Sequence, residues 1–135
     1  MITKLDVEAP RRGLIEITAE VARLVADSGH DEGLCTVFVQ HTSCSLLIQE
    51  NADLSARRDL ERWFDRLAPE GDRLYTHTAE GADDMPAHIK AALTATSLGI
   101  PIVAGRLALG TWQGLYLFEH RAHGGVRRLV VHIGP

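Results

Sequence analysis

Four histidines of this sequence stand beside other polar side chains, and imidazole is well suited to chemistry near neutral pH. They are His41, His77, His88 and His120, among seven histidines in 135 residues. Imidazole can transfer protons, bind a metal ion through a neutral nitrogen or, once protonated, hold an anion. One such histidine alone is most often a solvated loop residue or a core residue bonded to a carbonyl, so the hypothesis depends on several of them converging.

Three of these histidines are expected to converge. His41 ends a segment, residues 35–41, in which apolar and polar side chains alternate, so we expect its ring to share the buried face and to need a partner there. His77 and His88 are separated by one loop that leads into a helix. Three imidazoles are the usual ligands of a zinc-like ion that keeps one position open, although this spacing is not a recognised zinc motif.

The sequence therefore predicts one divalent transition ion, zinc-like, bound by His41, His77 and His88, with water or a substrate oxygen in the remaining position. Nearby carboxylates are expected to orient the rings as hydrogen-bond acceptors. The candidates are Glu80, Asp84 and Glu119. The alternative is an anion site, in which partly protonated imidazoles hold sulfate or phosphate and no metal is present.

A second candidate is the segment Gly110-Thr111-Trp112-Gln113-Gly114, which lies between two apolar strand-like segments. Thr111 and Gln113 carry hydrogen-bonding groups, Trp112 offers a large flat face, and the glycines allow the backbone close to a ligand. A plain hairpin would favour Asn-Gly or Asp-Gly at this place. The segment is therefore a candidate binding loop, and a turn whose tryptophan packs on the sheet is the alternative.

Groups suited to binding oxyanions occur near both features. Hydroxyls and guanidinium forks fit phosphate or diphosphate. The residues concerned are Ser43, Ser45, Arg106, Thr111 and Arg121. Arg127 and Arg128, in contrast, are expected to lie on the solvated edge of a sheet.

Composition limits the class of protein. The formal net charge of −4 argues against general nucleic-acid binding. No apolar run approaches the roughly 20 residues of a membrane helix, and the first residues do not look like a signal peptide. Cys35 and Cys44 fit no zinc or redox spacing, so they are expected to be buried or half-buried thiols of a cytoplasmic protein.

Short strand-like segments are expected to position these residues. They are residues 2–7, 13–17, 35–41, 46–49, 102–103, 106–109, 115–121 and 127–133. Residues 122–125 are predicted to make the last hairpin turn. Because the strands follow one another with few helices between them, antiparallel pairing is favoured.

Two of three predicted helices are marked by their ends. Thr18 is expected to be the N-cap of the first helix, and Gly29 is expected to end it. Pro86 fits the first turn of a later helix. The sequence Gly99-Ile100-Pro101 is predicted to end that helix.

The remaining helix is predicted from an apolar stripe, and Asn51 or Asp53 is expected to cap it. The stripe consists of Leu60, Trp63, Phe64 and Leu67. This spacing places the four side chains on one helix face, so Trp63 is predicted to lie in the core. Together the elements predict an α+β fold, a single domain over residues 1–135, with a largely antiparallel sheet that is curved or two-layered and about three helices.

Several blocks of the sequence resemble a known family in order and spacing. They are His41-Thr42-Ser43-Cys44-Ser45, Glu50-Asn51-Ala52-Asp53, Tyr75-Thr76-His77-Thr78, Asp84-Met85-Pro86-Ala87-His88-Ile89-Lys90, and residues 105–114 with Glu119-His120-Arg121 after them. They resemble the YjbQ-like family, also described as the secondary thiamine-phosphate synthase family, whose signature is Gly-Thr-Trp-Gln. One departure is that Gln49-Glu50 precedes Asn51, where many members have Asn-Glu.

The resemblance implies an α+β fold that assembles as a homotrimer, and a transferase of the thiamine-phosphate synthase type. That reaction joins a hydroxymethylpyrimidine diphosphate to a thiazole phosphate and releases pyrophosphate. The catalytic residues would be His41, His77, His88 and Glu119. The predicted substrate-binding residues are Ser43, Ser45, Arg106, Thr111, Trp112, Gln113 and Arg121, of which Ser43, Thr111, Trp112 and Gln113 match positions of the family. Mg²⁺ would accompany the diphosphate substrate, whereas three histidines suit zinc better.

Two other functions use the same groups. One is a metal-assisted hydrolase of a small phosphorylated metabolite, whose activity should be lost on chelation. The other is a non-catalytic trimer that binds a metal or an anion without turnover. No nucleic-acid or membrane partner is expected in any of the three cases.

Overall fold

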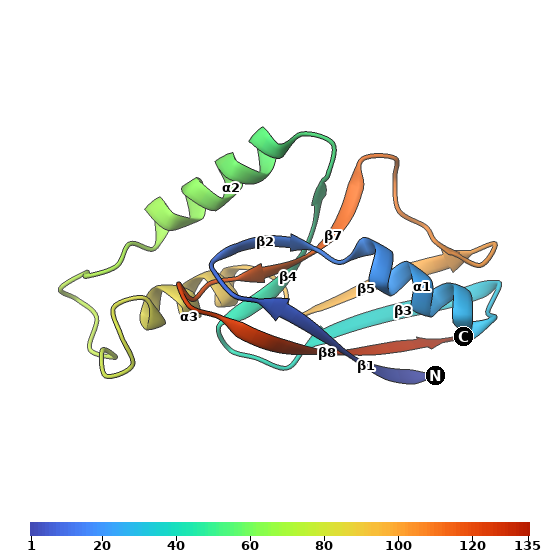
Figure 1. Ribbon diagram of the computed structural model, residues 1–135, viewed down its shortest axis with the longest axis horizontal. Coiled ribbons are helices and arrows are strands. Elements are labelled where there is room, and N and C mark those ends of the chain that lie inside the picture. The colour runs from blue at the N-terminus through green and yellow to red at the C-terminus, as the bar shows by residue number, and fades with distance from the viewer.

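A computed structural model describes residues 1–135 as two antiparallel sheets and three helices (Figure 1). The strands are β1 (Ile2–Ala9), β2 (Gly13–Glu16), β3 (Glu32–Val39), β4 (Cys44–Glu50), β5 (Ser97–Val103), β6 (Arg106–Leu107), β7 (Gln113–Glu119) and β8 (Gly125–Gly134). The helices are α1 (Thr18–Ser28), α2 (Leu54–Leu67) and α3 (Asp84–Leu93). The predicted α+β class, antiparallel pairing and number of helices are confirmed.

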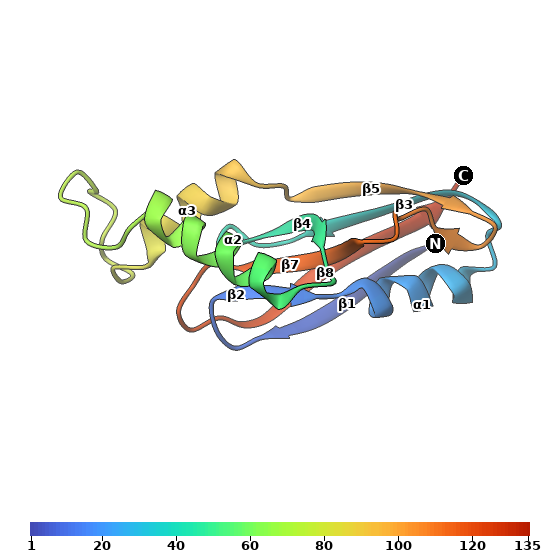
Figure 2. The ribbon, with the colours of Figure 1, turned by 90° about the horizontal axis from the view of Figure 1, so that it is seen from above.

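The two sheets form layers around one main core. Five strands pair in the order β1-β8-β3-β5-β6, and three pair in the order β2-β7-β4. The main core includes Val25 of α1, Val37 of β3 and Leu117 of β7, so it lies between the sheets and α1. Helices α1 and α3 lie toward opposite ends of the long axis (Figures 1 and 2).

Strand β3 shows how alternation builds the core and where it stops. Cys35, Val37 and Val39 are buried, as their parity predicts. The strand ends at Val39, however, and His41 lies in the connection to β4, where it is exposed. The prediction that His41 shares the buried face is therefore wrong, because the alternation does not continue past the end of the strand.

Helix α1 begins at Thr18, one residue earlier than a Thr18 cap would require, so the predicted cap is wrong. Ile17 is the N-cap, and the hydroxyl of Thr18 donates to Glu16 at 2.8 Å and accepts from the backbone N–H of Leu115 at 2.9 Å. The predicted C-terminal stop is confirmed, because Gly29 adopts a left-handed φ of 74°.

Helix α2 packs on the three-stranded sheet by part of its apolar stripe. Asp53 caps the helix, because its side chain accepts a hydrogen bond from the N–H of Ser55 at 2.8 Å. Of the two predicted caps, Asn51 and Asp53, the second is therefore confirmed. Leu60 and Phe64 pack against a small core on this sheet. Trp63 is 50% exposed, so its predicted place in the core is wrong. It stacks edge-on against Phe64, at the border of the packed stripe.

Helix α3 starts as predicted but ends early. Pro86 lies in its first turn, where a missing N–H costs no hydrogen bond. The helix ends at Leu93, and Gly99 and Pro101 pair with β3 as part of β5. The predicted end at these residues is wrong, because Thr94 already takes an extended conformation after the helix.

The connection between β7 and β8 joins the two sheets. β7 pairs with β2 and β4, whereas β8 pairs with β1 and β3, so residues 122–125 do not form the predicted hairpin. β8 lies inside the larger sheet, so the prediction of an edge position for Arg127 and Arg128 is also wrong. The side chain of Arg127 is only 11% exposed. Arg128 is exposed and pairs with Asp6 at 3.0 Å.

Cys35 and Cys44 are free and buried, as predicted. Burial raises the pKa of Cys35 to about 11 and, with the charge of Glu119, that of Cys44 to about 12. None of the three helices is long and apolar enough to cross a membrane.

Candidate metal centre

His77, Asp84 and His88 form a compact cluster of side chains that can ligate a metal. Their ligand atoms all lie within 4.8 Å of one another. Oδ2 of Asp84 is 2.8 Å from Nε2 of His77 and 3.3 Å from Nε2 of His88. Ligand atoms at zinc distances around a tetrahedral ion stand about 3.3 Å apart. Asp84 and His88 have this spacing, so the three residues are candidate ligands of one ion.

Helix α3 and the loop before it hold this cluster. Asp84 and His88 are four residues apart on α3, so their side chains extend from the same helix face. The ring of His77 comes from the loop and is 51% exposed, whereas the side chain of Asp84 is 1% exposed. A carboxylate as buried as Asp84 needs charged or hydrogen-bonding partners.

Arg121, directly after His120, supplies those partners. Its Nη1 donates to Oδ1 of Asp84 at 2.8 Å, and its Nε donates to Oδ2 of Asp83 at 3.1 Å. Its Nη2 donates to the carbonyl of Glu80 at 2.8 Å. The hydrogen bond with Asp83 raises the pKa of Arg121, so the guanidinium stays charged. Arg121, predicted to bind substrate phosphate, is thus engaged in holding the loop and the start of α3.

The tautomer of a neutral His88 is fixed by the backbone. Its Nδ1 lies 3.1 Å from the carbonyl oxygen of Thr42. A carbonyl only accepts, so Nδ1 must carry the hydrogen. A neutral His88 therefore presents the lone pair of Nε2 toward Asp84. This arrangement, in which a backbone carbonyl orients a histidine, is common at metal sites.

His41 lies beside this cluster but is not one of its three members. Its Nδ1 accepts from the backbone N–H of Ser43 at 3.0 Å, and its Nε2 lies 2.9 Å from Nη1 of Arg127. Partial removal of the ring from water and the charge of Arg127 lower the pKa of His41. His41 therefore favours the neutral form.

Glu119 is fully buried and holds the fork of Arg127. Its two oxygens accept from Nε of Arg127 at 2.6 Å and from Nη2 at 3.1 Å. The backbone N–H groups of His120 and Arg121 also donate to Glu119, each at 3.1 Å. No part of Glu119, one of the predicted catalytic residues, is exposed, and its carboxylate orients the guanidinium of Arg127.

Two predicted substrate-binding serines are buried in the same region. The hydroxyl of Ser45 shares a 2.8 Å hydrogen bond with Nε2 of His120, and both residues are fully buried. Ser43 is buried as well, and its carbonyl accepts from the backbone N–H of His120 at 3.1 Å. The three residues join β4 to the end of β7.

The other predicted binding residues lie elsewhere. In the pairing of β4 with β7, Glu119 stands opposite Cys44 at one end and Gln113 opposite Glu50 at the other. Seven strand residues span roughly 20 Å, so Thr111, Trp112 and Gln113 are far from the histidine cluster in one chain. These residues, and Arg106 on β6, are exposed. The backbone N–H of Gly110 donates a hydrogen bond to Oε1 of Gln113 at 2.8 Å, which closes the loop on itself.

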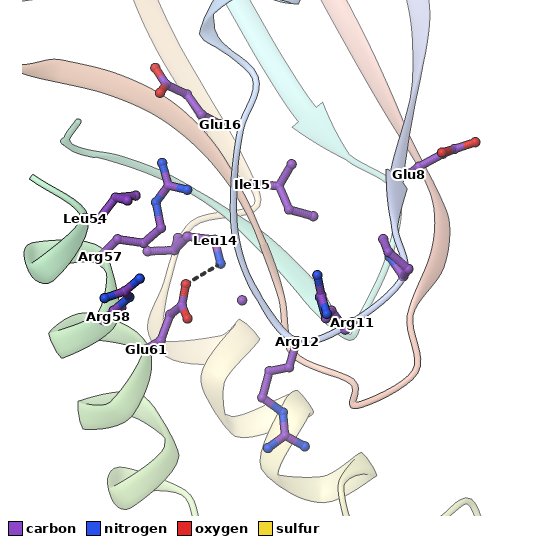
Figure 3. A pocket seen from close by; sticks show the side chains of 12 residues that line it. Glu8, Arg11, Arg12, Leu14, Ile15, Glu16, Leu54, Arg57, Arg58 and Glu61 are labelled. Atoms are coloured by element: carbon purple, nitrogen blue, oxygen red, sulfur yellow. Dashed lines mark hydrogen bonds between the residues drawn. The ribbon is translucent and has the colours of Figure 1, made fainter. Parts of the chain in front are cut away.

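The largest cavity lies between β2 and α2, outside this centre (Figure 3). It has a volume of about 520 Å³. Arg11, Arg58 and Glu61 are among its lining residues, and Glu61 accepts from the backbone N–H of Leu14 at 3.1 Å. No residue of the histidine cluster lines it, and the cluster meets solvent mainly through the half-exposed ring of His77.

Two residues of the site were not predicted in the roles that the geometry gives them. Asp84 was expected to orient a ring, yet it offers an oxygen to both His77 and His88. Its spacing of four residues from His88 on one helix was the available signal. Arg127 was expected at a solvated edge, and no sequence signal linked it to Glu119 on the other sheet.

Comparison with known proteins identifies the family. The sequence model of the family described as UPF0047 protein YjbQ-like matches residues 3–134. The chain belongs to this YjbQ-like family. The chain is 53% identical over 129 residues to the UPF0047 protein sll1880 of Synechocystis, covering 96% of this chain and 88% of the relative. It is 46% identical over 127 residues to YjbQ of Escherichia coli O157:H7, covering 93% and 91%.

Solved structures of the YjbQ-like family share the fold. A crystal structure of an uncharacterised conserved protein of the family from Clostridium acetobutylicum matches with a TM-score of 0.88 and 37% identity, over 98% of this chain and 99% of that one. A YjbQ-like protein from Sulfolobus solfataricus, described as of unknown function, matches with a TM-score of 0.87 at 24% identity, over 98% and 96%.

These comparisons correct the expected function. The Synechocystis and E. coli relatives are named only as UPF0047 proteins, and the two solved structures are described as uncharacterised or of unknown function. None of the four is named a thiamine-phosphate synthase. The predicted joining of a hydroxymethylpyrimidine diphosphate to a thiazole phosphate is therefore contradicted, and these comparisons show the family and the fold.

Proposed function

We propose that the protein binds one divalent transition ion, zinc-like, through His77, Asp84 and His88, and that this ion is its reactive centre. The observation that carries the proposal is the contact between His88 and Asp84. The Nδ1–H of His88 faces a carbonyl, so the Nε2 lone pair of the neutral ring points at a carboxylate oxygen 3.3 Å away. Two acceptors at this distance repel each other unless a cation lies between them.

The cation can be a proton or a metal ion, and the third residue favours the metal. Nε2 of His77 also approaches Oδ2 of Asp84, at 2.8 Å. One carboxylate oxygen thus meets two imidazole nitrogens from different segments, and the two rings lie with centroids 5.5 Å apart. A neutral His77 could donate to Asp84 from Nε2–H and a proton could bridge Asp84 and His88, whereas one divalent ion serves all three ligands at once. Two imidazoles and a carboxylate suit zinc or ferrous iron better than Mg²⁺.

An ion with three protein ligands keeps at least one position for water or a ligand. Such an ion can polarise an oxygen of a bound ligand or lower the pKa of bound water. Asp84 reaches the ion from a buried position that Arg121 holds, which orients the carboxylate before the ion binds. The exposed side of His77 leaves the centre accessible to small molecules.

The experiment is elemental analysis of protein purified without a polyhistidine tag, followed by zinc titration of the stripped protein at pH 7.5. We expect one ion per chain, and release as pH falls and the imidazoles become protonated. Removing one ligand, in His88→Ala or Asp84→Asn, should weaken binding by at least about tenfold.

The matched control is His132→Ala, which removes an exposed histidine of β8 and should leave zinc affinity unchanged. A wild-type protein that binds no zinc, or a control variant that loses as much affinity as the ligand variants, would overturn the proposal.

The free, buried thiols of Cys35 and Cys44 favour a reducing compartment, so we also propose a cytoplasmic location.

A further inference from the structure

His41 and Arg127 face each other with an acceptor missing between them. The backbone N–H of Ser43 points at Nδ1 of His41 at 3.0 Å, so this nitrogen must be unprotonated to accept. A neutral imidazole then carries its hydrogen on Nε2. That nitrogen lies 2.9 Å from Nη1 of Arg127, and a guanidinium can only donate. Two donors meet, and neither tautomer of His41 satisfies both contacts.

Changing the charge of either group does not remove the conflict. A protonated His41 would lose the hydrogen bond from Ser43 and would stand as a second cation beside Arg127. Arg127 stays charged because Glu119, fully buried, accepts from its Nε and Nη2. The same salt bridge fixes the guanidinium plane and leaves Nη1 as the donor without a suitable acceptor.

We propose that His41 and Arg127 form a subsite for the oxyanion group, phosphate or carboxylate, of a small ligand. One ligand oxygen accepts from Nε2–H of His41 and from Nη1–H of Arg127, about 2.8 Å from each. The two nitrogens must move apart to admit it. Arg127 is held by Glu119, so the exposed ring of His41 is the part that turns.

The subsite adjoins the proposed metal centre through the chain and through hydrogen bonds. Thr42, next to His41, accepts from Nδ1 of His88. Glu119, which holds Arg127, also accepts from the backbone of Arg121, whose side chain holds Asp84. The inference rests on the proposed function in one respect: a ligand anchored at His41 would place another of its atoms near the ion.

The test measures binding of inorganic phosphate and, separately, acetate to metal-stripped protein at pH 7.5 by calorimetry. Long-range ¹H–¹⁵N spectra of the histidine rings are recorded alongside. We expect the Nε2–H tautomer for His41 and a shift of that signal when the anion binds. His41→Ala removes the hydrogen bond from Nε2–H of His41 to the anion and should weaken anion binding by about tenfold or more. His132→Ala should not change it.

Arg127→Lys keeps the positive charge but loses the fork, and it should also weaken phosphate binding. If this buried variant does not fold, His41→Ala decides the question, because His41 is exposed. Wild-type protein that binds neither phosphate nor acetate, or anion binding that is unchanged in His41→Ala, overturns the subsite. Zinc binding without anion binding would support the metal centre and overturn the subsite. Anion binding without zinc binding would support the subsite and overturn the metal centre. Dependence on His41 for acetate or for phosphate supports the proposal and assigns the ligand class.

Discussion

His120 is a histidine that the fold keeps neutral. Its ring is fully buried against Phe118, with centroids 4.3 Å apart, and shares a hydrogen bond with Ser45. Burial, together with the charges of Lys90 and Arg12, lowers the pKa of His120 to about 3. Its Nδ1 has no hydrogen-bond partner, so the ring has no local compensation for a positive charge.

The neutral His120 makes stability depend on pH. The unfolded chain binds a proton at the ordinary histidine value of 6.5, whereas the folded chain does so only at about 3. The free energy of unfolding should therefore fall as pH drops below 6.5 toward 3, by up to about 1.4 kcal/mol per unit. Urea unfolding of wild type and His120→Gln across this range should give a flatter curve for the variant. Equal slopes would contradict the prediction.

The sequence predicts the chemistry of single residues best where the partners are close in the chain. His77 and His88 were expected to converge because one short loop joins them, and the structure brings them together at Asp84. The pairing of Arg127 with Glu119 could not be predicted, because it links strands of different sheets. An arginine in an alternating strand looks like a solvent-facing residue until its buried partner is known.

At the scale of the elements, one ion pair, buried only on its lysine side, connects α2 to α3. Nζ of Lys90 donates to Asp65 at 2.6 Å, and the Lys90 side chain is 2% exposed whereas that of Asp65 is 45% exposed. Removing Asp65 leaves a buried ammonium without its partner, so Asp65→Ala should destabilise the protein by about 1–3 kcal/mol. Replacing the cation itself, in Lys90→Met, should change stability little, because Asp65 remains solvated.

Denaturant unfolding of the two variants tests this asymmetry. Equal losses of stability in Asp65→Ala and Lys90→Met would show that the pair acts only through its mutual attraction. The metal-binding stoichiometry of Lys90→Met serves as a check that α3 keeps its position, since Asp84 and His88 lie on the same helix.

Local signals predicted most elements, and nonlocal pairing decided the rest. The left-handed Gly29, the cap at Asp53 and the early Pro86 are each readable from a few residues. The sequence Gly99-Ile100-Pro101 looks like a helix stop, yet it pairs with β3 as a strand. Proline and glycine mark the absence of helix there, but they do not say whether a loop or a strand replaces it.

At the scale of the whole molecule, the outward face of the five-stranded sheet carries exposed apolar side chains. On β3, β5 and β8 these are Leu34, Phe38, Val103 and Val126, between 42% and 62% exposed. All four alternate with residues whose side chains face the core. An apolar sheet face of this kind favours association with further copies.

We therefore expect a homotrimer in solution, as the family resemblance implies. Light scattering at micromolar concentration should give three times the chain mass of 14.8 kDa. Phe38→Asp should lower that mass toward the monomer, because a charge would be buried on the shared face. Trp63→Asp, on the exposed side of α2, is the control and should leave the mass unchanged. A monomeric wild type would refute the expectation.

The order of strands in the larger sheet has a consequence for synthesis. β8 is the eighth strand along the chain, yet it stands between β1 and β3 and pairs with both over most of its length. A ribosome releases the chain from its N-terminus, so β1 and β3 emerge first and have no common neighbour until β8 follows. The larger sheet can close only after that strand is made, and during this delay the nascent chain carries two open strand edges that chaperones can bind.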